Sequence, residues 1–108
     1  MGKIFIRENL IRSTPKIAGK EILTLIDVRT KREYSMGHIE TAINIPIDEL
    51  RENINKLDKK SNIIVYCATS YRSYLAYRIL ANKGFENIKR FSWEKAAIKI
   101  LEIYERLN

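Results

Sequence analysis

Cysteine and histidine are nearly absent from this 108-residue chain, which contains one of each. A single cysteine cannot form an internal disulfide, and this favours a reducing compartment, so the sequence predicts a cytoplasmic protein. A metal site built on one cysteine and one histidine would need several converging carboxylates, and no segment suggests such a cluster. We therefore expect no metal ion and no bound cofactor.

Long apolar runs and dense basic runs are also missing. No apolar run approaches the roughly 20 residues that cross a bilayer, and no signal-peptide pattern opens the chain, so we expect no membrane association. Lysine and arginine outnumber the acidic residues by 20 to 13, and the net charge of +7 favours anionic partners. These basic residues are spread along the chain without a nucleic-acid motif, so we expect no nucleic-acid partner.

Apolar segments instead alternate with helical patterns, within a length typical of one domain that spans residues 1–108. Short, largely β-branched runs predict strands at 22–26, 42–45, 63–66 and 88–91. Apolar residues at helical spacing predict helices at 30–37, 48–57, 74–82 and 94–107. This alternation predicts an α/β domain with a central, mostly parallel sheet and helices on both faces.

Single residues mark where several of these elements begin or end. Thr30 and Glu33 form a capping-box pattern at the start of a helix, and Gly84 stands where a helix end favours a left-handed residue. Residues 1–20 are less regular. There we expect a short edge strand from the apolar residues at 4–6 and 10–11, and a short helix between Pro15 and Gly19.

The only cysteine, Cys67, ends an apolar strand and precedes a helix, with the sequence Cys-Ala-Thr-Ser-Tyr-Arg-Ser over residues 67–73. Backbone N–H groups at a helix start are unpaired, and the helix dipole there favours negative charge. A thiolate in such a cradle is stabilised and becomes a better nucleophile, and Arg72 adds a cation nearby. The alternative is that Cys67 is a small buried hydrophobic residue that ends a strand.

Three more candidate site residues lie at or near the ends of predicted strands. They are Asp27, Arg29 and His38. The carboxyl ends of parallel strands share one edge of a sheet, so these side chains could approach Cys67. Asp27 and Arg29 either order the site electrostatically or form a structural ion pair, and we favour the ion pair. His38 is either a base that activates Cys67 or a histidine bonded to backbone at a turn, and we favour the second reading.

Five segments together resemble the signature segments of a rhodanese (sulfurtransferase) domain, and the resemblance extends over about residues 22–91. They are Leu25-Ile26-Asp27-Val28-Arg29, Glu33-Tyr34 with Gly37-His38-Ile39, Ala42-Ile43-Asn44-Ile45-Pro46, Cys67 to Ser73, and Gly84-Phe85. The stretch from Arg72 to Leu80 looks most like rhodanese domains fused to flavin-dependent coenzyme A-disulfide or polysulfide reductases. The resemblance therefore implies an oxidoreductase domain as a partner.

The resemblance also implies roles for the loop. Cys67 would accept a sulfane sulfur as a persulfide, and Arg72 would hold an anionic donor. The segment that cradles the anion would consist of Ala68, Thr69, Ser70, Tyr71, Arg72 and Ser73. Asp27, Arg29 and His38 would be supporting residues. The sequence departs from the family pattern at two places. Ser70 stands where glycine is frequent and would be strained at positive φ. Ser92-Trp93-Glu94 replaces the usual glycine pair before the last helix, so Trp93 is expected to crowd or cover the pocket mouth.

These observations leave three candidate functions for the protein. The first is a sulfurtransferase that uses thiosulfate or polysulfide and passes sulfur to a small thiol or a protein thiol. The second is a sulfur-relay or regulatory module of a flavin-dependent pyridine nucleotide-disulfide oxidoreductase, with little activity alone. The third is cysteine phosphatase or arsenate reductase chemistry, which the loop length disfavours because a tetrahedral oxyanion needs a larger ring of amides than Cys67 to Arg72 provides.

Overall fold

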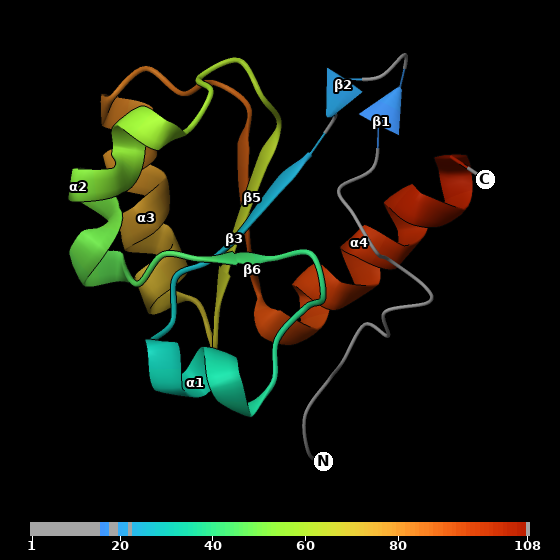
Figure 1. The fold of residues 1–108 in the computed structure, drawn as a ribbon, viewed down its shortest axis with the longest axis horizontal. Coiled ribbons are helices and arrows are strands. Elements are labelled where there is room, and N and C mark those ends of the chain that lie inside the picture. The colour runs from blue at the N-terminus through green and yellow to red at the C-terminus, as the bar shows by residue number, and fades with distance from the viewer. Residues whose placement is uncertain (1–15, 18–19, 22, 108) are drawn as a thin grey trace.

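A four-stranded parallel sheet forms the centre of the molecule (Figure 1). The computed structural model describes residues 16–17, 20–21 and 23–107. The strands lie in the order β4 (Ile43–Asn44), β3 (Thr24–Asp27), β5 (Ile63–Cys67) and β6 (Ile88–Ser92), and each neighbouring pair is parallel. The α/β class and the parallel sheet predicted from the sequence pattern are therefore confirmed.

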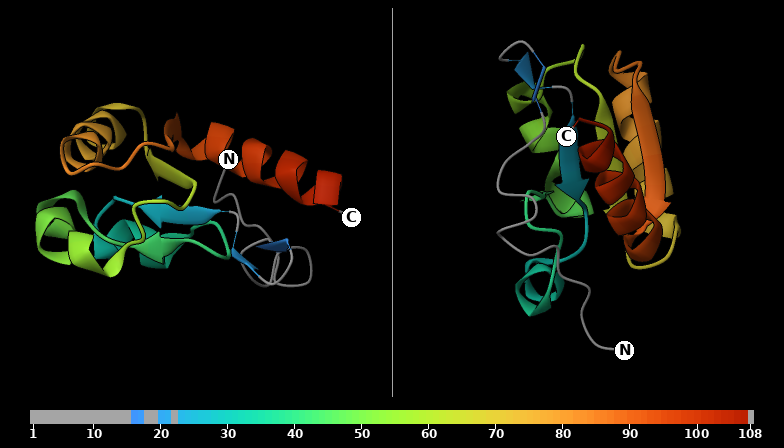
Figure 2. Two further views of the ribbon diagram at one scale, coloured as in Figure 1. Left: turned by 90° about the horizontal axis from the view of Figure 1, so that it is seen from above. Right: turned by 90° about the vertical axis from the view of Figure 1, so that its right-hand side faces the viewer.

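Helical segments connect the strands and lie on both faces of the sheet (Figure 2). Helix α1 (Lys31–Met36) follows β3, α3 (Tyr71–Asn82) follows β5, and α4 (Trp93–Leu107) follows β6. Between β4 and β5 come η1 (Ile47–Glu49), α2 (Leu50–Asn53) and η2 (Ile54–Lys56). No helix in the described ranges is long and apolar enough to cross a membrane.

Strand β5 supplies side chains to two hydrophobic cores, because successive side chains of a strand point to opposite faces. Ile63, Val65 and Cys67 belong to the core that α2 and α3 cover, whereas Ile64 and Tyr66 belong to the core that α4 covers. All five side chains are buried, which explains why this strand is an unbroken apolar run. Cys67 thus faces the α3 side of the sheet.

The residues expected to end or begin elements behave as the sequence predicts. Glu33 N–H donates to Thr30 Oγ1 at 3.1 Å and Thr30 N–H donates to Glu33 Oε1 at 3.0 Å, so the capping box of α1 is complete. Gly84 has φ +95°, the left-handed region that a helix end favours. Phe85 is buried against the α3 side of the sheet.

Two helix predictions need correction in their bounds. Helix α3 begins at Tyr71 instead of residue 74, because Ser70 C=O already accepts from Tyr74 N–H at 2.9 Å. The polar first turn of this helix carries no apolar periodicity, so the sequence pattern missed it. The helix expected at 48–57 is divided into η1, α2 and η2, because the segment begins and ends in tight turns with i→i−3 bonds. Its predicted apolar side is confirmed, since Leu50 and Ile54 are buried.

The short helix expected between Pro15 and Gly19 is wrong. Lys16–Ile17 forms strand β1, which pairs antiparallel with β2 (Lys20–Glu21). In the sequence, a single glycine suits a hairpin as well as a helix end, and no apolar periodicity separates the two readings over so few residues. The edge strand expected at 4–6 and 10–11 lies outside the described residues, as does Ile22 of the first predicted strand.

Candidate active site

The sulfur of Cys67 caps helix α3. Cys67 is the last residue of β5 and is 1% exposed. The N–H of Ser73, the third residue of α3, donates to Cys67 Sγ at 3.2 Å. Ser70 occupies the N-cap position but makes no capping bond with its own side chain, so the sulfur takes the place of the usual capping oxygen. The nucleophile predicted at a helix start therefore lies where a backbone donor meets it.

The residues between Cys67 and α3 form an exposed connection. Ala68, Thr69 and Ser70 are exposed, and Tyr71 is the most exposed large hydrophobic side chain of the described residues at 68%. Ser70 has φ −147°, so the strain expected for a non-glycine residue here is absent, because the backbone does not enter the left-handed region. Ser73 is fully buried, and its hydroxyl donates to Ser70 C=O at 3.0 Å.

Arg72 is engaged by a carboxylate from another helix. Its two terminal guanidinium nitrogens donate to Glu33 Oε1 at 2.7 Å and Oε2 at 3.1 Å. These bonds, together with those from Thr30, hold the pKa of Glu33 at about 2, well below its ordinary value of 4.5. The same bonds raise the pKa of Arg72. The cation predicted beside Cys67 is therefore present, but it forms a two-pronged ion pair that sequence reasoning missed.

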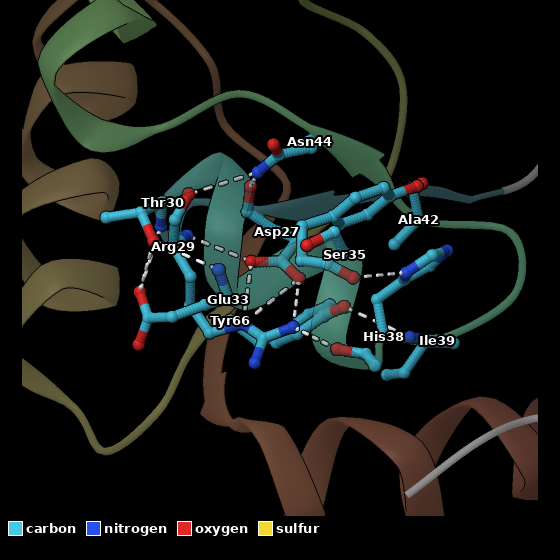
Figure 3. A network of polar contacts seen from close by, with 12 residues as sticks. Asp27, Arg29, Thr30, Glu33, Ser35, His38, Ile39, Ala42, Asn44 and Tyr66 are labelled. Carbon is cyan, nitrogen blue, oxygen red and sulfur yellow. Dashed lines mark hydrogen bonds and ion pairs between the residues drawn. The ribbon is translucent and has the colours of Figure 1, made fainter. Parts of the chain in front are cut away.

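Asp27 and Arg29 form a buried ion pair at the end of β3 (Figure 3). Arg29 Nη2 and Nε donate to Asp27 at 2.7 to 3.1 Å, and the backbone N–H of Arg29 donates to the same carboxylate at 2.9 Å. Arg29 Nη2 also donates to Gly37 C=O at 2.7 Å, while Asn44 Nδ2 donates to Asp27 C=O and Arg29 C=O at 3.0 Å. Asp27 and Arg29 thus have the geometry of a buried structural ion pair, which is the interpretation favoured from the sequence.

Two aromatic side chains enclose Arg29. The Trp93 ring centroid lies 3.7 Å from Arg29 Cζ, and the Tyr66 centroid lies 5.6 Å from it. Trp93 is the first residue of α4 and directly follows Ser92, the register partner of Cys67. Its indole N–H is buried without a hydrogen-bond partner, alone in this respect among side-chain polar atoms of the described chain. Trp93 therefore lies at the same sheet edge as Cys67, while its role at a pocket mouth stays a prediction.

Tyr66, which packs against Arg29 and Trp93, also bonds to the backbone. The N–H of Ile39 donates to Tyr66 Oη at 3.2 Å. Burial raises the pKa of Tyr66, and the Asp27 carboxylate raises it further. The phenol therefore stays protonated and uncharged near neutral pH.

His38 is bonded to the backbone at the turn that follows α1. Its Nδ1 lies 2.7 Å from Tyr34 C=O, and because a carbonyl only accepts, Nδ1 carries the proton. Its ring stacks on Tyr34 with centroids 3.6 Å apart. Within the described ranges no hydrogen bond joins His38 to Cys67, and this geometry agrees with the preferred reading of a turn histidine.

The sequence analysis also did not identify a cluster of one tyrosine and two arginine side chains, formed by Tyr74, Arg78 and Arg90. Arg78 Nη1 donates to Tyr74 Oη at 2.8 Å, and the Cζ atoms of Arg78 and Arg90 lie 5.8 Å and 5.1 Å from the Tyr74 ring centroid. The signal for it was the exposed helical stripe of Tyr71, Tyr74 and Arg78, which begins at the cysteine loop. Arg78 and Arg90 are both exposed, so the cluster carries their two positive charges at the surface.

A hollow in the described part of the chain lies elsewhere. It has a volume of about 680 Å³ and is lined by residues at the beginnings of β5 and β6, such as Ile63 and Ile88, and by Ile103 of α4. That is the opposite end of the strands from Cys67. We place the candidate active site at Cys67, because the only thiol and its backbone donor lie there. Across the described residues, no three His, Cys, Asp or Glu side chains group closely enough to hold a metal ion.

The arrangement defines a class of protein: a parallel α/β domain that presents a cysteine sulfur to the start of a helix. The model of the Rhodanese-like domain family matches residues 13–94 of the chain. Because this match covers well over half of the sequence, the chain belongs to the rhodanese-like domain family. The resemblance predicted from the five sequence segments is therefore confirmed.

Known proteins similar to this chain include sulfur-handling proteins. A Schizosaccharomyces pombe protein with the provisional name of mitochondrial thiosulfate sulfurtransferase is 30% identical over 112 residues, which cover 90% of this chain and 79% of that protein. A Bacillus subtilis protein, YrkF, provisionally named a sulfur carrier protein, is 32% identical over 73 residues, which cover 68% of this chain. The chain spans only 40% of the length of YrkF.

Two solved structures extend the comparison. An E. coli rhodanese with anions has a TM-score of 0.63 and 32% identity, covering 67% of this chain and 88% of that chain. An NAD-dependent persulfide reductase from A. fulgidus has a TM-score of 0.57 and 33% identity, covering 75% of this chain but 14% of that chain. Domains similar to this one thus occur both alone and as a part of a reductase.

Proposed function

We propose that the chain is a sulfurtransferase that carries sulfane sulfur as a persulfide on Cys67 and delivers it to a thiol. The observation that supports this most directly is the hydrogen bond from Ser73 N–H to Cys67 Sγ at the start of α3. A helix start favours negative charge, so it suits both a thiolate and the persulfide anion that replaces it. The sulfurtransferase name of the S. pombe relative points in the same direction.

The reaction has two balanced steps. The Cys67 thiolate attacks the outer sulfur of the donor, the donor S–S bond breaks, and the leaving group departs with the electron pair, as sulfite from thiosulfate or as a thiolate from a persulfide. An acceptor thiolate then attacks the outer sulfur of the Cys67 persulfide, forms the acceptor persulfide and returns the Cys67 thiolate. Residues 1–108 contain no second cysteine, so this acceptor is a small thiol or a protein thiol outside them.

Other residues of the loop have proposed supporting roles. The exposed residues Ala68 to Tyr71 bound the entry to the sulfur, and Ser73 supplies the amide. The contact of Arg72 with an anionic donor stays a prediction, because the guanidinium is bonded to Glu33. The cytoplasmic location expected from the single cysteine also stays a prediction.

A sulfur-relay module is the second candidate function. It is favoured by the likeness to a small part of the A. fulgidus reductase and to a part of the sulfur carrier YrkF. Such a module would accept sulfur once and discharge it efficiently only to a thiol of its partner. Turnover of the isolated chain with donor and a small thiol distinguishes the two functions, because a relay module would give one equivalent and then stop.

Mass spectrometry of the protein after treatment with a sulfane-sulfur donor tests the proposal. We expect a mass increase of one sulfur atom in the wild-type chain, its absence in Cys67→Ser, and its loss when a thiol is added after the donor is removed. An adduct that persists in Cys67→Ser would contradict the assignment. Loss of the sulfur without any thiol would contradict the carrier role.

A further inference from the structure

Two ion pairs lie at the sheet edge where Cys67 ends β5. Glu33 of α1 neutralises Arg72 of α3 across 39 positions of sequence, with both of its oxygens bonded to the guanidinium. Asp27 neutralises Arg29 at the end of β3. Among the residues described at this edge, the group that meets the sulfur itself is the uncharged N–H of Ser73. The site therefore offers a helix dipole to an anion, while its two arginines are already matched.

Glu33 is firmly placed in this arrangement. Its Oε1 accepts from Thr30 N–H at 3.0 Å and Thr30 Oγ1 at 3.1 Å as well as from Arg72. One carboxylate thus belongs both to the capping box of α1 and to the cysteine loop. An incoming donor would have to break this two-pronged ion pair before it could take Arg72 for itself.

The number of negative charges on the sulfur donor then determines how strongly the site stabilises it. A single negative charge at the outer sulfur is stabilised by the amide dipoles of a helix start, which amount to about half a unit charge. Thiosulfate brings a second negative charge on its sulfonate, and that charge meets an arginine whose field is cancelled by Glu33. A persulfide of an uncharged thiol brings at most one charge and leaves the ion pair intact.

We propose that Glu33 is a specificity-determining residue that disfavours doubly charged donors such as thiosulfate and favours organic persulfides of low charge. This inference rests on the proposed sulfur-transfer function and names the donor class of the same site. Glu33 and Arg72 act here through their summed charge, and Arg72 is not a free anion-binding cation. The side chain of Glu33 is 36% exposed, so solvent screening limits the effect.

The test is a cycle of charge variants measured with two donors. The rate of adduct formation on Cys67 is followed by rapid quenching and mass spectrometry, with thiosulfate and with the persulfide of 2-mercaptoethanol. Glu33→Gln keeps an acceptor oxygen for Thr30 and Arg72 but removes one negative charge, and we expect the thiosulfate-to-persulfide rate ratio to rise on the order of tenfold. Arg72→Gln leaves Glu33 unmatched, and the ratio should fall by a similar factor.

The double variant Glu33→Gln/Arg72→Gln separates charge from direct contact. Its site charge equals that of the wild type, so we expect a rate ratio within about twofold of the wild-type value. If Arg72 held the sulfonate directly, the double variant would instead resemble Arg72→Gln, and the inference would be overturned. Glu102→Gln, which removes an exposed carboxylate paired with Lys99 in the body of α4, is the control and should leave the ratio unchanged.

Other outcomes are also decisive. A fall in both rates in Glu33→Gln, with no change in their ratio, would show that Glu33 only positions Arg72, and would overturn the inference. The Arg72→Gln variant leaves the Thr30–Glu33 capping bonds in place, so it still tests the inference if Glu33→Gln folds poorly. Failure of the proposed function looks different, since no donor would then load Cys67 in any variant.

Discussion

Removing the carboxylate of Asp27 should destabilise the protein more than any change of a surface ion pair. Asp27 is fully buried and Arg29 is 5% exposed, so in Asp27→Ala the guanidinium would keep its charge without water or a counterion. Four of the hydrogen bonds that Arg29 donates end on this carboxylate. Breaking a buried pair by removing one partner typically costs about 3–5 kcal/mol. A domain of this size has a total unfolding free energy of roughly 5–15 kcal/mol, so the loss would be a large part of it.

Equilibrium unfolding in urea, followed by far-ultraviolet circular dichroism, measures this loss. Trp93 fluorescence gives a second probe, because its ring lies against Arg29. The control is Glu102→Gln, whose exposed partner lies at 3.5 Å and whose pairing should contribute under about 1 kcal/mol. The double variant Asp27→Leu/Arg29→Met removes both charges and fills similar volume, so we expect it to be more stable than Asp27→Ala.

Two results would refute this reasoning. A loss of less than about 1 kcal/mol in Asp27→Ala would place the pair in the same class as exposed ion pairs. A double variant that is less stable than Asp27→Ala would show that the packing of Arg29 against Trp93 and Tyr66 matters more than its charge.

Two further predictions concern Glu33 and Trp93. Because Arg72 lowers the pKa of Glu33 from 4.5 to about 2, the ion pair stabilises the fold fully above pH 4.5 and loses this contribution as the pH falls toward 2. The unfolding free energy of Glu33→Gln, measured against pH in urea, should therefore decline less over that window than that of the wild type, and parallel curves would contradict the pairing. Indole fluorescence should change when Cys67 takes up sulfur, since Trp93 lies at the same sheet edge, whereas unchanged fluorescence together with unaltered transfer rates in Trp93→Gly would make Trp93 a packing residue only.

The sequence predicted the local parts of this structure well. Thr30 and Glu33 are close in sequence, and the capping box between them needs only a helix to form. Gly84 is also predicted from local sequence alone, because the end of a helix favours a residue in the left-handed conformation. The apolar run before Cys67 indicated a strand buried on both faces, and β5 lies between β3 and β6 with both faces covered.

Features that depend on the relative placement of distant segments were harder to predict. The partner of Arg72 lies 39 positions away, and Glu33 had already been explained by its bond to Thr30, so no signal assigned it a second partner. The parallel order of the sheet brings the residues after β3 and β5 to one edge, and that argument could have suggested the pair. For Ser70, residue type alone implied strain at positive φ, whereas its actual backbone conformation suits any residue.

The capping of α3 by Cys67 means that the group that donates to the sulfur belongs to the main chain. Only a substitution by proline deletes a backbone N–H, so every other residue at position 73 supplies this donor, as long as the first turn of α3 forms. Side chains on the exposed connection before the helix are then free to vary without removing that donor. If Cys67 carries sulfur as proposed, changes there would alter which molecules reach it, while the backbone donor would be retained with the fold.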